Sequence, residues 1–358
     1  MIVREILRII VALVFIVSGF VKAVDPVGFS FKLEEYFGAG VFNLPLLEKN
    51  ALLIGIVVVV IELFLGLSLL IKYKVKAVLV ALIILCVFFG FLTFYSAYFN
   101  VVTDCGCFGD ALKLTPWQSF WKDIVLLVLL VILHLLNRKA NEKAREKKLW
   151  KVIILGFCGA IMGSIIMKGI KEEPIIDFRD YKVGTDLRLE KKKIADDPSV
   201  YQTIYKLKDK VTGQEKKVNQ DQFVANKEYW SKDSNWEIQS DKTTQELKYQ
   251  GYQSEISKFK IENGEGEDIT QEILDAEHVV LVFAYKPHDV PAELKQSIEN
   301  KVKANPLVYG VSTSLDTFSV IENTKMDGIA IKTIARSNPF VLVLQKGKII
   351  EKVPGKNY

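Results

Sequence analysis

The chain changes character near residue 171. Before this point long apolar runs alternate with short basic loops, whereas the residues after Glu172 are polar, rich in Lys and Glu, and only locally apolar. A helix needs about 20 mainly apolar residues to cross the hydrocarbon core of a bilayer. Five runs meet this length, at residues 6–24, 51–71, 77–98, 117–136 and 149–170. The pattern therefore predicts a membrane α-helical bundle of five transmembrane helices followed by a soluble half.

The first run has a second interpretation. Arg4 and Arg8 precede an apolar stretch that ends in Val-Lys-Ala at Ala23, which is the layout of a cleaved signal peptide. However, Lys22 would lie directly beside the cleavage site, and no other small residue supports that site. We therefore expect the first run to remain a membrane span.

Two stretches outside the spans also have informative patterns. Residues 25–45, "DPVGFSFKLEEYFGAGVFNLP", mix Phe, Val and Leu with charges, which suits a short amphipathic helix at the outer surface. The fourth span opens with Thr115, which can accept amide hydrogen bonds, and Pro116, which has no amide to satisfy. Trp117 and Trp121 then fall where an aromatic belt would meet the headgroups.

The soluble half contains alternating segments. Residues 199–218, "SVYQTIYKLKDKVTGQEKKV", predict a two-stranded hairpin that turns at Thr212 and Gly213. Further on, the pattern predicts a strand at 278–285, a helix at 292–303, a strand at 307–312, a helix at 317–323, and two strands that meet at Lys346 and Gly347. This half is therefore expected to be an α+β region.

The succession of strand, helix, strand, helix, strand and strand resembles a thioredoxin-like α/β domain over residues 273–358. In that resemblance Pro339, within "SNPFVLVL", takes the place of the family's cis-proline before a sheet strand. Where such a fold carries Cys-x-x-Cys, this chain reads "YKPHDVPAE". His288 beside Asp289 could be a base or a metal ligand, but we expect a surface loop. The resemblance implies a redox-silent module.

The expected domain boundaries follow from these patterns. Residues 1–172 form the membrane domain, residues 173–272 an extracytoplasmic strand-containing region, and residues 273–358 the thioredoxin-like domain.

The charges of the loops predict an orientation. Basic clusters occur at Arg4 and Arg8, at Lys72, Lys74 and Lys76, and between residues 138 and 148. Short loops rich in Lys and Arg stay in the cytoplasm, and five spans place all three clusters on one side. We expect a multi-pass protein of the bacterial cytoplasmic (inner) membrane with a cytoplasmic amino terminus and an extracytoplasmic, periplasmic part after Lys171.

The four cysteines divide into two pairs. Cys105 and Cys107 fall in an outward loop where thiols can oxidise, whereas Cys86 and Cys158 fall near the middles of spans. A buried free cysteine behaves as a small hydrophobe, so we expect Cys86 and Cys158 to serve packing. The soluble half has no cysteine and carries out no thiol chemistry itself.

The loop sequence "DCGCFGD" suggests redox chemistry. Cysteines two apart close only a small, strained disulfide ring, and Gly106 supplies the backbone freedom that such a turn needs. A strained disulfide is easily reduced, which favours exchange over a permanent link. A structural disulfide and a metal half-site are the alternatives. A metal site needs three or four ligands and no other Cys or His is near, so no metal is expected.

Three motifs in order, "VSGFVKAVDPVGF", "ELFLGLSLL" and "DCGCFGD", resemble the MauE branch of the DoxX-like membrane proteins, with a four-helix core, over residues 1–136. The resemblance implies a factor similar to those of methylamine utilisation, which help to form or deliver a disulfide-rich subunit of methylamine dehydrogenase. Nothing in this sequence points to methylamine itself. The fifth span and the outer half extend beyond the usual length of that family.

The same motifs carry ionisable residues at membrane depth. Glu62 lies near the middle of the second span, where a charge costs at least about 2.5 kcal/mol, so we expect it to be neutral or paired. Lys22 is long enough to reach inward, and Asp25 follows one turn later. These residues could form a Lys22–Glu62 or Lys22–Asp25 pair that fixes the bundle, or they could handle protons.

Other residues near the loop bear on its reactivity. Asp104 and Asp110 flank the cysteines and would weaken a thiolate, whereas Lys122 and the start of the fourth helix would favour one. Phe108 and Gly109 complete the loop motif. An aromatic cluster at the outer end of the third span fits either a membrane belt or a quinone site: Phe94, Tyr95, Tyr98 and Phe99.

Together these patterns predict a membrane-integral thiol-disulfide maturation factor. One thiolate of Cys105 and Cys107 would exchange with a client sulfur, and the other would resolve the mixed disulfide. The expected partners are the lipid bilayer and an extracytoplasmic client protein with cysteines, with no nucleic acid. A non-enzymatic assembly scaffold with a structural disulfide and a quinone-linked oxidoreductase are the alternatives. The sequence establishes no cofactor, and only the quinone-linked alternative would use one, a quinone.

Overall fold

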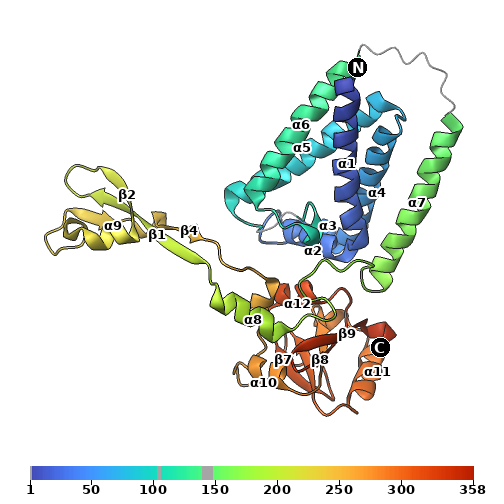
Figure 1. The fold of residues 1–358 in the computed structure, drawn as a ribbon. Helices are drawn as coiled ribbons and strands as arrows, with labels where there is room; N and C mark the ends of the chain where they lie inside the picture. Colours follow the sequence, from blue (N-terminus) through green and yellow to red (C-terminus); the bar gives the residue numbers. More distant parts are fainter. Residues whose placement is uncertain (1, 103–105, 139–147) are drawn as a thin grey trace. The chain divides into compact units, whose positions relative to one another are not determined.

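The computed structural model describes residues 2–102, 106–138 and 148–358. The chain divides into two compact units. Figure 1 shows their helices and strands. The first combines Met1–Gly184 with Ile261–Tyr358, and the second, Thr185–Lys260, is inserted between them in the sequence. The domain boundaries expected at residues 172 and 272 remain a prediction.

The first unit begins with the predicted bundle. The five long helices are α1 (Ile2–Val24), α4 (Ala51–Leu70), α5 (Val75–Phe99), α6 (Pro116–Arg138) and α7 (Lys148–Lys171). Each is long and apolar enough to cross a membrane, which confirms the five spans that hydropathy predicts. The short helices α2 (Pro26–Phe37) and α3 (Pro45–Lys49) lie between the first two long ones, where an amphipathic helix is expected.

Local capping explains where two of these helices begin. The side chain of Asp25 accepts a hydrogen bond from the amide of Gly28 and so caps α2. At the start of α6, Thr115 Oγ1 accepts from the Gln118 amide, and Gln118 Oε1 accepts from the Thr115 amide. This reciprocal pair is a capping box directly before Pro116.

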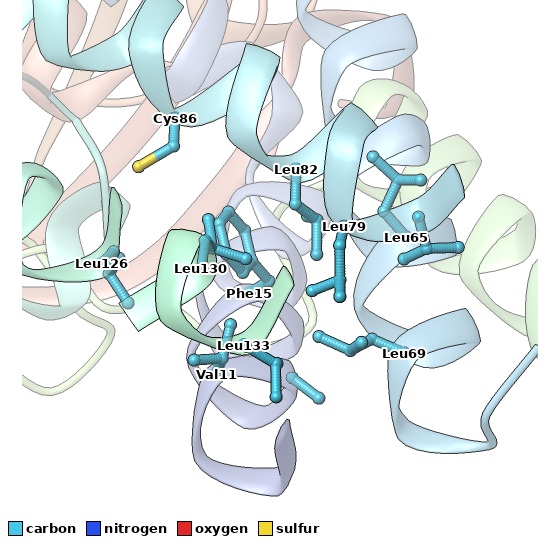
Figure 2. Packing of buried hydrophobic residues seen from close by; sticks show 12 residues of the cluster. Val11, Phe15, Leu65, Leu69, Leu79, Leu82, Cys86, Leu126, Leu130 and Leu133 are labelled. Atoms are coloured by element: carbon cyan, nitrogen blue, oxygen red, sulfur yellow. The ribbon is translucent and has the colours of Figure 1, made fainter. Parts of the chain in front are cut away.

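Four helices share one apolar core (Figure 2). The side chains labelled there come from α1 (Val11, Phe15), α4 (Leu65, Leu69), α5 (Leu79, Leu82, Cys86) and α6 (Leu126, Leu130, Leu133). Helix α7 packs more peripherally, against α1, α4 and α2. Because lipid is as apolar as leucine, close packing rather than burial from water holds such a bundle together. The four-helix core thus forms from residues 1–136, and α7 is added to it.

The second unit is built on a four-stranded antiparallel sheet. Strand β1 (Val200–Asp209) pairs with β2 (Glu215–Asn219), β3 (Trp236–Ile238) and β4 (Thr244–Tyr249). The β1–β2 pair is the predicted hairpin, and Gly213 takes the left-handed conformation in its turn. Helices α8 (Leu187–Asp196) and α9 (Gln220–Ala225) complete the unit, whose small core is centred on Leu207 and Tyr229.

A five-stranded sheet ends the first unit. Its order is β7-β6-β5-β8-β9, formed by β5 (Val279–Ala284), β6 (Val308–Ser312), β7 (Glu322–Lys325), β8 (Phe340–Gln345) and β9 (Lys348–Pro354). Strands β5, β6 and β7 are parallel, and β8 is antiparallel to both neighbours. The central strand β5 is apolar and buried throughout. The helices are α10 (Thr270–Asp275), α11 (Ala292–Val302) and α12 (Gly328–Ile334).

This sheet confirms two predicted strands, the helix after the first of them, and the closing hairpin at Lys346 and Gly347. The predicted helix at 317–323 is wrong, because these residues form a turn that leads into β7. The Asn323 side chain bonds to both the amide and the carbonyl of Phe318. Two further amides of the turn donate to Glu299 Oε1. Side-chain bonds of this kind replace the backbone bonds of a helix.

The segment after α7 joins the bundle to this sheet through a buried charge cluster. The guanidinium of Arg179 bonds to Glu173, to Asp177 and to the carbonyl of Ile334, and Lys352 of β9 contacts both acids. Burial alone would raise the pKa of Asp177, but the charges and hydrogen bonds of Arg179 and Lys352 hold it at about 2.

Candidate functional site

The cysteine loop connects α5 to α6. Cys105 and Asp104 lie outside the described residues, so the geometry of the cysteine pair is not part of this description. From Gly106 the chain turns tightly, with the Gly109 amide donating to the Gly106 carbonyl at 3.0 Å. Both glycines have positive φ, at 65° and 51°, a conformation that favours glycine. The sequence Cys-Gly-Cys-Phe-Gly is thus suited to a compact turn that begins between the two cysteines.

Side chains of three helices hold this turn. Ser18 of α1 donates to the carbonyl oxygen of Cys107 at 2.8 Å. The ammonium of Lys122, on α6, lies 5.3 Å from the ring centre of Phe108. A β-carbon at Gly106 would lie 2.9 Å from Cγ of Lys32, on α2, so the loop backbone approaches that helix closely. Cys107 is buried as a result.

A buried polar chain continues inward from Ser18. Lys22 donates to Ser18 Oγ at 3.0 Å and to Glu62 Oε2 at 2.6 Å. The side chains of Lys22 and Glu62 are each only 3% exposed. The rings of Phe29 and Phe89 lie 5.4 and 5.2 Å from the same ammonium. Of the two pairs considered for Lys22, the structure therefore contains the one with Glu62.

A second buried acid, Asp123 on α6, was missed by the sequence analysis. Its carboxylate lies 2.9 Å from Lys122 Nζ and accepts a hydrogen bond from Thr93. Its backbone carbonyl accepts from the thiol of Cys86 at 3.2 Å. An acid inside an apolar span is a signal that could have drawn attention to it. Ser18 also had a signal, since it lies one helical turn before Lys22.

One small cavity connects these groups. The volume of this cavity is about 20 Å³, which leaves room for about one water molecule. Its lining consists of Val14, Phe15, Ser18, Lys22, Glu62, Cys86, Phe89, Cys107, Phe108, Lys122, Asp123 and Leu126. The structure therefore brings Cys86, expected to serve packing alone, to the same cavity as Cys107. Cys158 is half-buried on α7 and is not part of the lining.

On its other side the loop meets the carboxyl-terminal part of the first unit. Arg336 donates through Nε to both oxygens of Asp25, at 2.9 and 2.7 Å, and through Nη2 to Asp110 at 2.7 Å. The Arg336 side chain is 3% exposed. Asp25 is therefore paired with Arg336 rather than with Lys22. The two partners are 311 residues apart, and no local pattern indicates their pairing.

A second group of contacts lies on α2. Glu34 accepts from Lys286 at 2.9 Å and from Lys332 at 2.8 Å. Phe31 meets the ring of Tyr285 edge-on, with centroids 5.1 Å apart. Burial, together with the nearby carboxylate of Glu34, raises the pKa of Tyr285 to about 12, so its hydroxyl stays neutral at physiological pH.

The remaining candidates lie elsewhere. The Asn338–Pro339 peptide bond is cis, two residues after Arg336. His288 is exposed in a short 3-10 turn, Pro287–Asp289. The rings of four residues contact one another and neighbouring aromatic rings at the end of α5: Phe94, Tyr95, Tyr98 and Phe99. Within the described residues, no three His, Cys, Asp or Glu side chains gather as a metal site would require.

Comparison with known proteins shows which proteins the bundle is similar to. Residues 1–136 match the family described as methylamine utilisation protein MauE. The chain is also 29% identical over 143 residues to Protein TlpB of Flavobacterium psychrophilum. That alignment covers 38% of this chain and 38% of the relative, so the chain spans well under half of the relative's length. No solved structure matches. Over residues 1–136, the chain is therefore similar to the MauE-like membrane family.

Proposed function

We propose that this protein is a membrane-integral thiol-disulfide exchange factor that acts on extracytoplasmic client proteins through Cys105 and Cys107. The observation that carries the proposal is the set of hydrogen bonds and the ion pair that lie behind Cys107. Its carbonyl is hydrogen-bonded by Ser18, which in turn accepts from a buried Lys22–Glu62 pair. Ionisable groups at membrane depth are costly and mark functional sites. A loop that only closed a turn would not need such a chain behind it.

The exchange conserves electrons and protons. A client thiolate attacks one sulfur of the Cys105–Cys107 disulfide, that disulfide breaks, and a mixed disulfide forms. The second client thiolate attacks the client sulfur of the mixed disulfide, so the client leaves oxidised. Cys105 and Cys107 take up two electrons and two protons and become thiols. The two-residue spacing of the cysteines keeps the disulfide ring small, and therefore strained and reactive.

A single-turnover experiment tests this proposal. The oxidised protein, reconstituted in lipid, is mixed with a reduced peptide that carries two cysteines, and peptide disulfide is measured over time. We expect one peptide disulfide per protein. Cys105→Ser and Cys107→Ser should each reduce this yield to background, because neither variant can hold the reacting disulfide.

The matched control is Cys158→Ser, which changes a cysteine outside the cavity and should keep the wild-type yield. If the wild type yields no more peptide disulfide than the background of the Cys105→Ser and Cys107→Ser variants, the proposal is wrong and an assembly scaffold becomes the better interpretation. Reoxidation of the reduced protein by an added quinone would assign it instead to the quinone-linked class.

We also propose that the carboxyl-terminal domain, residues 273–358, is thioredoxin-like and presents the client to the cysteine loop. Its mixed sheet, with β5 at the centre and α11 between two parallel strands, supports this assignment. It has no cysteine of its own. Its contribution would be to hold a client near the loop, where proximity replaces a diffusive encounter.

The proposed orientation has the loop and this domain outside the cytoplasm. Contacts at the opposite end of the bundle support it, because they gather the basic loops there. Lys72 forms an ion pair with Glu5 at 2.9 Å, and Lys151 donates to the Lys72 carbonyl. Loops rich in Lys and Arg stay in the cytoplasm. Lys139, Lys143, Arg145 and Lys147, which belong to the third basic cluster, lie outside the described residues.

Protease added to spheroplasts should remove the part of the chain after Lys171 and leave the bundle in the membrane. The fragments can be followed with tags at the two termini. Cytoplasmic protein digested in the same sample would reveal lysis. Protection of the carboxyl-terminal tag in intact spheroplasts would contradict the proposed orientation.

A further inference from the structure

Two acids near the cysteine loop, Asp25 and Asp110, share one buried cation. Every nitrogen of the Arg336 guanidinium is engaged: Nε with Asp25, Nη2 with Asp110, and Nη1 with the carbonyls of Lys332 and Ala335. The Phe31 ring centre lies 5.7 Å from its central carbon. Such a buried and fully bonded arginine has a fixed position relative to both acids.

The backbone of the bundle leaves space for this arginine. A β-carbon at Gly28 would lie 2.9 Å from Arg336 Nη2 and still closer to the Asp25 carboxylate. Glycine at this position therefore permits the close approach of the guanidinium to α2. Asp25 also caps α2, so its carboxylate is held from both sides.

Asp110 lies close to the cysteines along the chain. The turn closed by the Gly109 amide brings the chain back toward Gly106, and Asp110 follows immediately in the 3-10 turn Gly109–Ala111. A carboxylate near a cysteine disfavours the thiolate, and a cation favours it. Arg336 therefore neutralises the acid that would otherwise suppress the reactivity of the loop.

Other charged groups also face the loop, and the variants that test the role of Arg336 leave them unchanged. They are Lys22 and Glu62 on α1 and α4, Lys32 on α2, and Lys122 and Asp123 on α6. Asp104 is adjacent to Cys105 in the sequence and lies outside the described residues. Arg336 differs from all of these because it comes from the carboxyl-terminal domain.

We propose that Arg336 is a positioning residue through which the carboxyl-terminal domain sets the reactivity of the cysteine loop. This inference deepens the proposed thiol-disulfide function and rests on it for its biological meaning. When Arg336 is in place, its charge offsets one of the two negative charges of Asp110 and Asp25, and the thiolate is favoured. When the domain is absent or displaced, both acids face the loop without a counter-charge.

The test measures how fast the reduced loop cysteines are alkylated, as a function of pH, in full-length protein in lipid. Mass spectrometry of peptides assigns the modified cysteine, which keeps Cys86 and Cys158 separate. In Arg336→Gln, the pH midpoint of alkylation should rise by about one unit, since the loss of one nearby positive charge in a partly buried site has an effect of this order. At a fixed pH below the midpoint, the rate should fall about tenfold.

Two variants keep the test decisive. Asp110→Asn with Arg336 retained should lower the midpoint, and the Arg336→Gln, Asp110→Asn double variant should return it toward the wild-type value. Lys332→Gln is the matched control, because it weakens a contact to Glu34 without touching Asp25 or Asp110, and its midpoint should not move.

A purely structural role for Arg336 predicts a different pattern. Opening the contact would expose the loop and speed alkylation at every pH with no shift of the midpoint, and this result would overturn the inference. An unchanged midpoint in Asp110→Asn would also overturn it. If the midpoints shift as expected but the peptide substrate is never oxidised, the inference stands and only the proposed function fails.

Discussion

Replacing Glu62 with leucine destabilises the bundle by about 3–5 kcal/mol, because it leaves the Lys22 ammonium buried without a counter-charge. The two side chains are each 3% exposed and their charged atoms are 2.6 Å apart. The loss can be measured in detergent micelles as a lower midpoint of thermal unfolding, followed by the circular dichroism of the helices.

A double replacement provides the control. Lys22→Met combined with Glu62→Leu removes both charges and fills the space with apolar atoms, so its stability should return close to that of the wild type. If Glu62→Leu alone unfolds at the wild-type temperature, the pair does not stabilise the bundle as an ion pair. The comparison follows the logic of a double-mutant cycle.

The same double variant distinguishes the two roles considered for the pair. If Lys22 and Glu62 only fix the arrangement of α1 and α4, the stable double variant should still exchange disulfides with a peptide. If they carry protons to or from the loop through Ser18, exchange should be lost although the fold is kept. The measurement therefore separates a structural role from a chemical one.

Arg179→Met is expected to loosen the carboxyl-terminal domain by about 3–5 kcal/mol, since Glu173 and Asp177 would then share only Lys352 as a buried counter-charge. Limited proteolysis reports the free energy of such opening when cleavage is slow relative to closing. Glu277→Gln, which removes an exposed ion pair with Lys346, should change the proteolysis rate little.

The effect of pH on this cluster has a defined sign. The folded pKa of Asp177, about 2, lies below its ordinary value of 3.8, so the ionised carboxylate stabilises the fold above about pH 4. That contribution disappears as the pH falls toward 2. In Arg179→Met the pKa of Asp177 should rise, and opening in acid should begin at a higher pH. Identical acid profiles for wild type and variant would contradict this account of the cluster.

The sequence was sufficient for features that depend on local patterns. Hydropathy predicted all five long helices to within a few residues, because the length and apolar character of a span are properties of a continuous segment. The same holds for the hairpins at Gly213 and Gly347, where residues with positive φ mark the turns. The helix predicted at 317–323 was wrong because hydrogen bonds to a distant side chain, above all that of Glu299, decide the conformation there.

The candidate site was only partly predictable for the same reason. The isolated charge of Glu62 inside a span indicated that it needed a partner, but not which of its neighbours would provide one. The pairing of Arg336 with Asp25 and Asp110 joins parts of the chain that are hundreds of residues apart. Nothing in the local sequence of either part encodes that contact.

The insertion of the second unit has a consequence for how this protein can evolve. Both residues that flank it are anchored in the first unit, Gly184 through the Ile349 carbonyl and Ile261 through Thr270. Insertions between two fixed points of a folded scaffold are well tolerated. One continuous stretch of the gene can therefore be lengthened, trimmed or exchanged while the bundle, the cysteine loop and Arg336 keep their sequence, which leaves the inserted unit free to diverge faster than the rest.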